Sequence, residues 1–297
     1  MKTAFKKISI ALLTVAFALT LATSFAACNK KKDSIPDVNY AVTNNFEITT
    51  TDYTINPEAK EEERIGARIY APNGVNAKYG VLFFPGTITA PEYYDYLCIA
   101  LAKQGYFVAT PALLLASLQY DTTTKPIADA IIAKYPNLKF FVGGHSQGGG
   151  AAIRFACEHL ENTLGAILFA PYDIFASREI TREEYDKDCK AHPEWFYVNG
   201  DKIYRTDTLA NTNLPTLILE ADKDHVLIGD AKNDAINKTP SKAMFFELKN
   251  ACHMGFSTWD FNLNGDGEDI TQEQKEAQRA LTISYVLDFL QITVANK

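Results

Sequence analysis

The sequence is poor in positive charge. Its 29 Lys and Arg residues are outnumbered by 36 Asp and Glu residues, which gives a formal net charge of −7. Because a nucleic-acid partner requires a basic surface against its phosphates, this balance argues against nucleic-acid binding. The chain also lacks internal repeats and long low-complexity tracts, and its 297 residues allow one large α/β domain or two small ones.

Cysteine is scarce as well, and its spacing does not suggest a metal site. None of the five cysteines forms a CxxC pair or a zinc-binding arrangement with histidine, and no cofactor is predicted. Cys98 and Cys157 fall in apolar helical patterns, where buried free thiols are expected. Export would permit disulfides, so the oxidation state of these two, of Cys189 and of Cys252 is left open.

The longest apolar run lies at the N-terminus. Lys2, Lys6 and Lys7 precede an apolar stretch over residues 8–21, and small residues follow it. This is the pattern of a signal peptide, which we place at residues 1–27. The apolar stretch is shorter than the roughly 20 residues that a transmembrane helix needs.

The end of the signal peptide resembles a bacterial lipobox. It reads Phe25-Ala26-Ala27-Cys28, with Phe where such boxes usually have Leu. The resemblance implies that Cys28 carries lipid and becomes the mature N-terminus. Residues 28–45 would then tether the protein to a membrane of the bacterial cell envelope. The alternative is a soluble secreted protein cleaved after Ala26.

From residue 46 to the C-terminus, predicted strands alternate with predicted helices. Short apolar runs indicate buried strands, and longer runs with helical spacing indicate helices. The expected strands cover residues 46–55, 64–70, 80–85, 106–110, 138–143, 164–170, 216–221 and 243–248, and the expected helices cover 92–104, 121–135, 147–160 and 272–292. This order predicts one α/β domain over 46–297, with a mostly parallel central sheet and helices on both faces.

Residues 173–213 interrupt this alternation. The stretch is charged and aromatic, and its Asn199-Gly200 pair is typical of a tight hairpin turn. We expect a small inserted cap, a helix followed by a hairpin, with Trp195-Phe196-Tyr197 forming one wall of an acyl pocket. The alternative is a peripheral insert that does not contact substrate.

The strongest motif is Gly144-His145-Ser146-Gln147-Gly148, which lies between an apolar strand and an apolar helix. In that context G-x-S-x-G is the signature of a nucleophile elbow, a sharp turn that exposes a reactive serine. Ser146 is therefore the predicted nucleophile, and we expect His145 to be structural. The alternative is a glycine-rich turn that happens to contain serine.

A serine nucleophile needs a base, and an acid to orient the base. With this elbow the acid follows the serine along the chain, and the histidine follows the acid. His253 comes after the last predicted strand, whereas the other histidines lie within the motif, in the next helix, in the insert and beside the acids. Asp222 and Asp224 both follow the strand at 216–221 and are the candidate acids.

An oxyanion hole requires two preorganised backbone N–H donors. The first is expected from Gln147, which follows the nucleophile. The second is expected from Thr87, which follows Pro85-Gly86 at the end of an apolar strand, where Gly86 allows close approach.

These pieces resemble the α/β-hydrolases of the dienelactone-hydrolase-like and cutinase-like polyester hydrolase group. The matching segments are GVLFFPGT, YYDYLCIALAKQGYFVATP, GGHSQGGGAAIRFA, LPTLILEADKDHVL and CHMGF, and they span residues 80–256. The resemblance implies hydrolysis of carboxylic esters without a metal. It also favours Asp224 as the acid, three positions after the small residue Ala221. Two departures are the long insert and His225, where such sequences often have a small residue or proline.

The motif does not fix the leaving group, so a thioesterase, an amidase or a peptidase with the same triad remains an alternative. A non-catalytic binding lipoprotein that keeps the fold is an alternative of another class.

One further stretch, residues 260–269, resembles a calcium loop. Its oxygen ligands would be Asn262, Asn264, Asp266 and Glu273. The pattern begins with Asn where such loops have Asp, and its apolar residue Ile270 comes one position late. The alternative is a polar turn that leads into a helix capped by Thr271.

Overall fold

The computed structural model describes residues 44–54, 66–172 and 178–296. All of them belong to the second of two compact units, Met1–Lys31 and Lys32–Lys297. The predicted signal peptide, Cys28, nearly all of the tether and the first residues of the insert lie outside the described residues. Within the described part of the chain, no helix combines the length and the apolar character that a membrane span requires.

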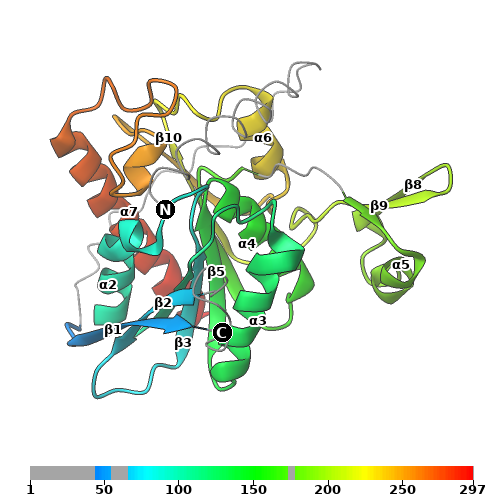
Figure 1. The fold of residues 1–297 in the computed structure, drawn as a ribbon, viewed down its shortest axis with the longest axis horizontal. Coiled ribbons are helices and arrows are strands. Elements are labelled where there is room, and N and C mark those ends of the chain that lie inside the picture. Colours follow the sequence, from blue (N-terminus) through cyan, green and yellow to red (C-terminus); the bar gives the residue numbers. More distant parts are fainter. Residues whose placement is uncertain (1–43, 55–65, 173–177, 297) are drawn as a thin grey trace. The chain divides into compact units, whose positions relative to one another are not determined.

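The fold is built on an eight-stranded sheet with the order β1-β2-β4-β3-β5-β6-β10-β11 (Figure 1). Its strands are β1 (Ile48–Thr54), β2 (Gly66–Pro72), β3 (Tyr79–Phe84), β4 (Phe107–Pro111), β5 (Lys139–His145), β6 (Thr163–Phe169), β10 (Thr216–Ala221) and β11 (Met244–Leu248). Strands β1 and β2 form an antiparallel hairpin, and β2 runs antiparallel to β4. From β4 to β11 every neighbouring pair is parallel, which confirms the predicted mostly parallel sheet.

Helices cover both faces of the sheet, as predicted. Helices α2 (Asp95–Lys103) and α7 (Gln272–Ala295) pack against one face, and α3 (Lys125–Lys134), α4 (Gln147–Glu158) and α6 (Asp230–Asn237) against the other (Figure 1). Alternate side chains of a strand point to opposite faces. Val81 and Phe83 on β3 thus join the core under α2 and α7, whereas Leu82 and Phe84 join the core on the other face.

Two of the predicted helices begin with a different kind of turn. A 3₁₀ turn, η2 (Pro91–Tyr94), precedes α2, and a π turn, η3 (Tyr120–Thr124), precedes α3. Pro126 lies in the first turn of α3, where a backbone N–H would have no partner within the helix. The sequence did not predict α6, whose short polar stretch buries little besides Ala235 and Ile236.

The insert has the predicted helix and hairpin, with one strand added. Helix α5 (Arg182–Asp188) is followed by the turn η4 (Pro193–Trp195) and by the hairpin of β8 (Phe196–Asn199) and β9 (Lys202–Arg205). The additional strand β7 (Arg178–Ile180) pairs with β9 and completes a separate sheet of order β7-β9-β8. Gly200 has the positive φ of 63° that the predicted hairpin turn needs.

The insert is joined to the core at its base. Trp195 is 2% exposed and belongs to the core cluster on the α4 face, and the Arg205 guanidinium lies 4.8 Å from its ring centroid. Arg205 also pairs with Asp207 at 2.6 Å, and Asp207 lies 3.6 Å from Arg154 on α4. Trp195 is therefore a buried anchor and not the exposed wall of an acyl pocket that we expected.

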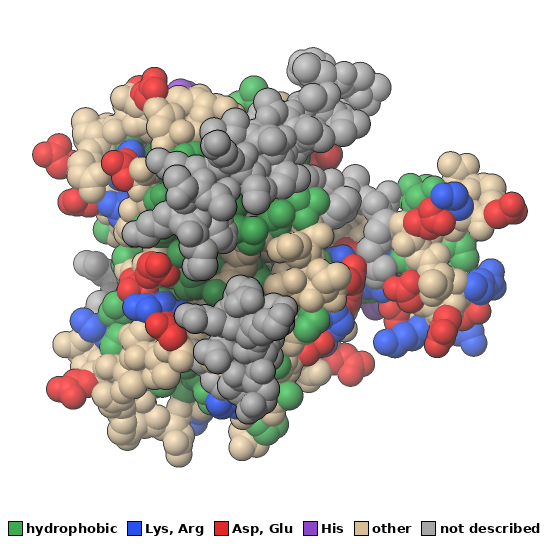
Figure 2. Space-filling model, viewed as in Figure 1, with side chains coloured by type: hydrophobic (Ala, Val, Ile, Leu, Met, Phe, Trp, Pro, Cys, Tyr) green, Lys and Arg blue, Asp and Glu red, His purple; other side chains and the backbone are tan. Residues whose placement is uncertain are grey.

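Charged side chains of both signs share the face shown in Figure 2, and the described cysteines form no disulfide. On the face shown in Figure 2, acidic and basic side chains are interspersed over the described residues. The four described cysteines, Cys98, Cys157, Cys189 and Cys252, are all free. Cys98 and Cys157 are buried, as their apolar surroundings predicted.

The anchor predicts a contrast within the insert. Trp195→Ala removes a large buried ring and should lower the free energy of unfolding by about 3–5 kcal/mol, measured by guanidinium denaturation. Val198→Ala, at a position that is 63% exposed, should change it by less than about 0.5 kcal/mol. Equal and small effects of the two substitutions would show that the insert is not anchored through Trp195.

Candidate active site

Ser146 lies in the sharp turn between β5 and α4. Its φ of 53° and ψ of −124° belong to a backbone region that a non-glycine residue rarely adopts. Such a conformation costs about 1–3 kcal/mol and persists only where the surrounding structure enforces it. Here the Ser146 N–H donates to Phe169 O at 3.0 Å, and Ser146 O accepts from Gly149 N and Tyr172 N.

Two glycines of the motif allow the turn to pack closely. A Cβ atom on Gly144 would overlap the backbone of Gly148, so the turn could not close. A Cβ atom on Gly148 would overlap the carbonyl oxygens of Phe84 and Pro85 at the end of β3. The N-terminus of α4 therefore lies directly against the segment that leads to Thr87.

The base and the acid meet in the interior. His253 follows β11, and its Nδ1 atom lies 2.7 Å from Asp224 Oδ2. The other Asp224 oxygen, Oδ1, accepts from Val226 N at 2.8 Å and Leu227 N at 2.7 Å, so the carboxylate has a fixed orientation. Both side chains are almost fully buried, with 2% and 1% exposed for His253 and Asp224.

Asp222 is placed differently from Asp224. Its Oδ1 atom accepts from Ala251 N at 3.1 Å, and its Oδ2 atom lies 3.8 Å from Lys249 Nζ. None of the bonds found for the described residues joins Asp222 to His253. Of the two candidate acids, the structure brings Asp224 to the imidazole.

The charges of the pair stabilise each other. Burial alone lowers the pKa of His253, but the charge and hydrogen bond of Asp224, with a smaller effect of Asp266, raise that pKa above its ordinary value overall. Burial raises the pKa of Asp224, whereas His253 and the two N–H donors lower it, and the balance is a lowered pKa. The carboxylate is thus ionised beside an imidazole that readily accepts a proton.

The residue before Ser146 contacts the base. The ring centroids of His145 and His253 are 4.7 Å apart, so the base lies beside the residue that precedes the nucleophile. Among the described residues no hydrogen bond joins Ser146 Oγ to His253. Catalytic hydrogen bonds are often long without substrate and shorten in the reacting complex.

The two predicted oxyanion donors have N–H groups without a partner among the described residues. The N–H groups beside Thr87 are used, since Ile88 N donates to Leu114 O and Gly86 N donates to the Tyr94 hydroxyl. Gln147 is the first residue of α4, where a backbone N–H has no partner within the helix. Both donors are therefore available to an external oxygen.

The side chains of Tyr94 and His145 connect the segment before Thr87 with the nucleophile turn. The Tyr94 hydroxyl accepts from Gly86 N at 3.0 Å and is hydrogen-bonded to His145 Nδ1 at 2.8 Å. Burial and the nearby His253 hold the pKa of His145 well below its ordinary value, so the ring is neutral. The geometry matches the structural role expected for His145, and the sequence offered no signal for Tyr94.

A second carboxyl group is buried close to the pair. Glu220 on β10 is fully buried, its oxygens have no hydrogen-bond partner among the described residues, and its nearest cation is Lys232 Nζ at 3.6 Å. Burial raises the pKa of Glu220 to about 8, although Lys232 opposes this shift. Sequence analysis did not single out Glu220, because it occupies a core position of a predicted strand.

The calcium-like loop uses its polar side chains for other contacts. Asn262 Oδ1 accepts from Gly265 N, and Asn262 Nδ2 donates to Glu268 Oε1. Both carboxylate oxygens of Asp266 accept backbone N–H bonds, including those of His253 and Met254. Within the described residues, no group of three or more His, Cys, Asp or Glu side chains could hold a metal. This arrangement favours the polar turn over a calcium loop.

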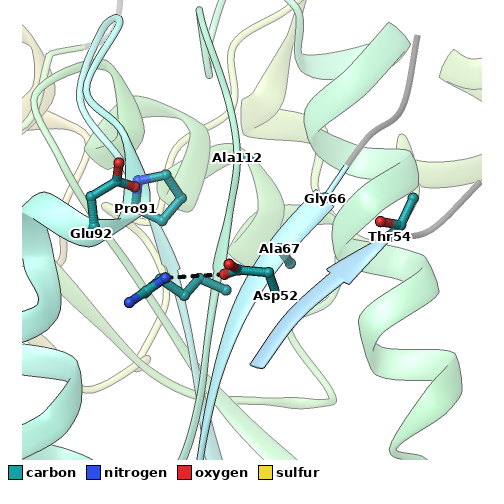
Figure 3. A pocket seen from close by; sticks show the side chains of 8 residues that line it. Asp52, Thr54, Gly66, Ala67, Pro91, Glu92 and Ala112 are labelled. Carbon is teal, nitrogen blue, oxygen red and sulfur yellow. Dashed lines mark hydrogen bonds and ion pairs between the residues drawn. The ribbon is translucent and has the colours of Figure 1, made fainter. Parts of the chain in front are cut away.

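A separate pocket of about 410 Å³ lies beside the β1–β2 hairpin (Figure 3). It is lined by Asp52, Thr54, Gly66, Ala67, Arg68, Pro91, Glu92 and Ala112. Among its described lining residues the one cation is Arg68, which is paired with Asp52 and Asp95 at 3.1 Å. None of the predicted site residues lines this pocket.

Comparison with known proteins agrees with the fold. The Alpha/beta hydrolase family profile matches residues 80–184, which include the elbow. No curated protein matches the chain. A solved structure described as a predicted CIB-like hydrolase from Thermoplasma acidophilum is 14% identical with a TM-score of 0.50, over 81% of this chain and 99% of that one.

A second solved structure, a thioesterase domain from the curacin biosynthetic pathway, is 12% identical with a TM-score of 0.48, over 79% of this chain and 99% of that one. The family match over residues 80–184 and the observed sheet agree on an α/β-hydrolase fold.

Glu220 predicts a pH dependence of stability. Its folded pKa, about 8, lies above the ordinary 4.5, so its contribution is fully present below pH 4.5 and is lost as the pH rises through 8. Glu220→Gln cannot ionise and should therefore gain stability relative to the wild type between pH 5 and pH 9. The gain should exceed about 1.4 kcal/mol, the equivalent of one pKa unit, in denaturation at the two pH values.

The matched control is Glu247→Gln, which alters another carboxylate near Lys232, at a position that is 26% exposed. The difference in stability between this variant and the wild type should be nearly the same at pH 5 and pH 9. If Glu220→Gln and the wild type lose stability in parallel from pH 5 to pH 9, Glu220 is not a buried, ionisable group.

Proposed function

We propose that the protein hydrolyses carboxylic esters through an acyl-enzyme intermediate, with Ser146, His253 and Asp224 as its triad. The observation that carries this proposal is the buried 2.7 Å bond between His253 and Asp224, beside a serine in a strained elbow. An acid that fixes an imidazole tautomer next to a serine is the arrangement that acyl transfer requires. The coarser assignment to a hydrolase agrees with the family match.

In the first half of the reaction, Ser146 Oγ attacks the ester carbonyl carbon while His253 Nε2 accepts the hydroxyl proton. Asp224 stabilises the imidazolium that forms, and the N–H groups of Thr87 and Gln147 stabilise the negative oxygen. Collapse of the tetrahedral intermediate breaks the ester C–O bond, and His253 returns its proton to the departing alcohol. The products at this point are the alcohol and an ester on Ser146.

In the second half, water takes the place of the alcohol. His253 removes a proton from the water, whose oxygen attacks the acyl carbon, and then returns the proton to Ser146 Oγ as the carboxylic acid leaves. Each proton that His253 accepts is returned, so the enzyme is unchanged after one turnover. No step requires a metal or an organic cofactor.

The ester class rests on the resemblance to dienelactone-hydrolase-like and cutinase-like enzymes. A thioesterase, amidase or peptidase would use the same groups, because the pocket and not the triad recognises the leaving group. A binding lipoprotein would keep the fold but would not react with an acylating probe.

The triad predicts a graded set of losses. Ser146→Ala should lower kcat on p-nitrophenyl acetate by about 10⁶-fold, because the covalent route is lost. Asp224→Asn should lower it by about 10⁴-fold through the wrong imidazole tautomer. Asp222→Asn is the matched control and should keep kcat within a small factor of the wild type.

A fluorophosphonate probe tests the same assignment without a chosen substrate. It should label the wild type and Asp222→Asn at Ser146, and should not label Ser146→Ala. An unlabelled wild-type protein would leave the binding lipoprotein as the better reading, and a severe loss in Asp222→Asn would move the acid to position 222.

The lipobox supports a lipid anchor at Cys28, which lies outside the described residues. In a bacterial host the protein should incorporate labelled palmitate and sediment with membranes, because several acyl chains on one cysteine give stable anchoring. Cys28→Ser should abolish both. Soluble export of an unlabelled wild-type protein would instead indicate cleavage after Ala26.

A further inference from the structure

We propose that Asp266 is a positioning residue that sets the spacing of the two loops carrying Asp224 and His253, an inference that rests on the proposed function. Its carboxylate is 3% exposed and lies in the turn before α7. Oδ1 accepts from His225 N and from His253 N, both at 3.1 Å, and Oδ2 accepts from Met254 N at 2.8 Å.

These three bonds reach both halves of the acid–base pair. His225 directly follows Asp224 in the loop after β10, and His253 lies in the loop after β11. The two strands are parallel neighbours that end in register at Ala221 and Leu248. Two bonds continue the contact just past the strands, from Lys223 N to Ala251 O at 3.0 Å and from Ala251 N to Asp222 Oδ1 at 3.1 Å. Asp266 joins the loops further along, at His225 and His253.

The bonds are of a strong kind. An ionised carboxylate that accepts backbone N–H groups forms charge-assisted hydrogen bonds, which are shorter and stronger than neutral ones. Because a buried carboxylate without partners is unfavourable, Asp266 constrains the three N–H groups to converge on it. The 2.7 Å bond between His253 and Asp224 forms across the gap that Asp266 spans.

The residue before His253, Cys252, is held by a neutral side chain. Gln278 on α7 accepts from Cys252 N at 3.1 Å and donates to Cys252 O at 2.9 Å, so it fixes the histidine loop alone. Asp266 differs because it contacts both loops and carries a charge close to the imidazole. Its loss should therefore affect the titration of His253 as well as the geometry.

The direction of that effect follows from the groups around His253. Asp224 raises the pKa of His253 most after burial has lowered it, and Asp266 and then Glu220 add to this. The neutral His145 lies beside the ring at the end of β5, and the backbone N–H of His225 donates to Asp266. Removal of the Asp266 charge should make the imidazolium less stable, so that the acid limb of the rate profile moves to lower pH.

The decisive variant is Asp266→Asn, which keeps the size of the side chain but removes the charge and faces one N–H with an amide donor. With p-nitrophenyl acetate, kcat should fall about 10- to 100-fold, because a small displacement of catalytic groups has effects of this size. KM should change little, and the acid limb of kcat/KM should lie at lower pH than in the wild type. Wild-type kcat with an unmoved acid limb would overturn the proposal.

Asp269→Asn is the matched control. It makes the same substitution three positions later, in a side chain that is 49% exposed and paired with Lys223 at 3.1 Å. It should leave kcat and the acid limb unchanged. If Asp266→Asn and Asp269→Asn shift the acid limb equally, the effect comes from net charge and the positioning role is wrong.

Circular dichroism would show whether Asp266→Asn folds. If it does not fold, Asp266→Glu tests the proposal instead. The longer side chain keeps the charge but misplaces the carboxylate, so kcat should fall while the acid limb stays near its wild-type pH. Wild-type kcat in this variant would overturn the proposal. If the wild type is labelled at Ser146 by fluorophosphonate, such a failure concerns Asp266 alone, whereas an unlabelled wild type contradicts the proposed function itself.

Discussion

The hydrogen bond between His253 and Asp224 is the contact on which the geometry of the site depends. It joins the loops that follow β10 and β11, and both of its side chains are almost fully buried. A charged pair in such a place is stable only when its remaining polar atoms have partners. The backbone supplies them, through the N–H groups of Val226 and Leu227 for Asp224.

The opposite side of the site is governed by close backbone packing and not by charge. Gly144 and Gly148 let the first turn of α4 lie against the end of β3, so that the N–H groups of Gln147 and Thr87 come from adjoining segments. The Tyr94 hydroxyl then links Gly86 to His145, next to the nucleophile. The buried side chains of Tyr94 and His145 thus connect the loop that carries Thr87 with the predicted base His253.

Prediction from sequence succeeded where the signal was local. The alternation of apolar runs predicted the parallel sheet, and the Thr271 cap marked the start of α7. The motif and the ends of the strands singled out Ser146, His253 and two possible acids, of which the structure pairs Asp224 with the imidazole. The turns before α2 and α3 and the polar helix α6 were missed, because tertiary contacts and not periodicity decide them.

Contacts between distant segments left no such signal. Tyr94 and His145 are 51 positions apart, and nothing in either local pattern indicates that they meet. Trp195 was assigned to a pocket wall because it lies in an aromatic run, yet its own neighbours His192 and Arg205 cover it at the base of the insert. The identity of a side chain in a run does not say which face of the chain it occupies.

The loop that resembles a calcium site is rich in Asn, Gly and Asp, and these residues can form either an ion-binding loop or a hydrogen-bonded turn. Asn264, Gly265 and Gly267 have φ values of 57°, 78° and 76°, a left-handed region that asparagine and glycine enter most easily. A calcium loop needs these residues to fold its ligands around an ion, whereas here they turn the Asp266 carboxylate inward onto backbone N–H groups. Position 225, where the related sequences often have a small residue or proline, supplies one of those N–H groups, which proline lacks. His225, a departure from the related sequences, and the acidic turn are therefore parts of one contact.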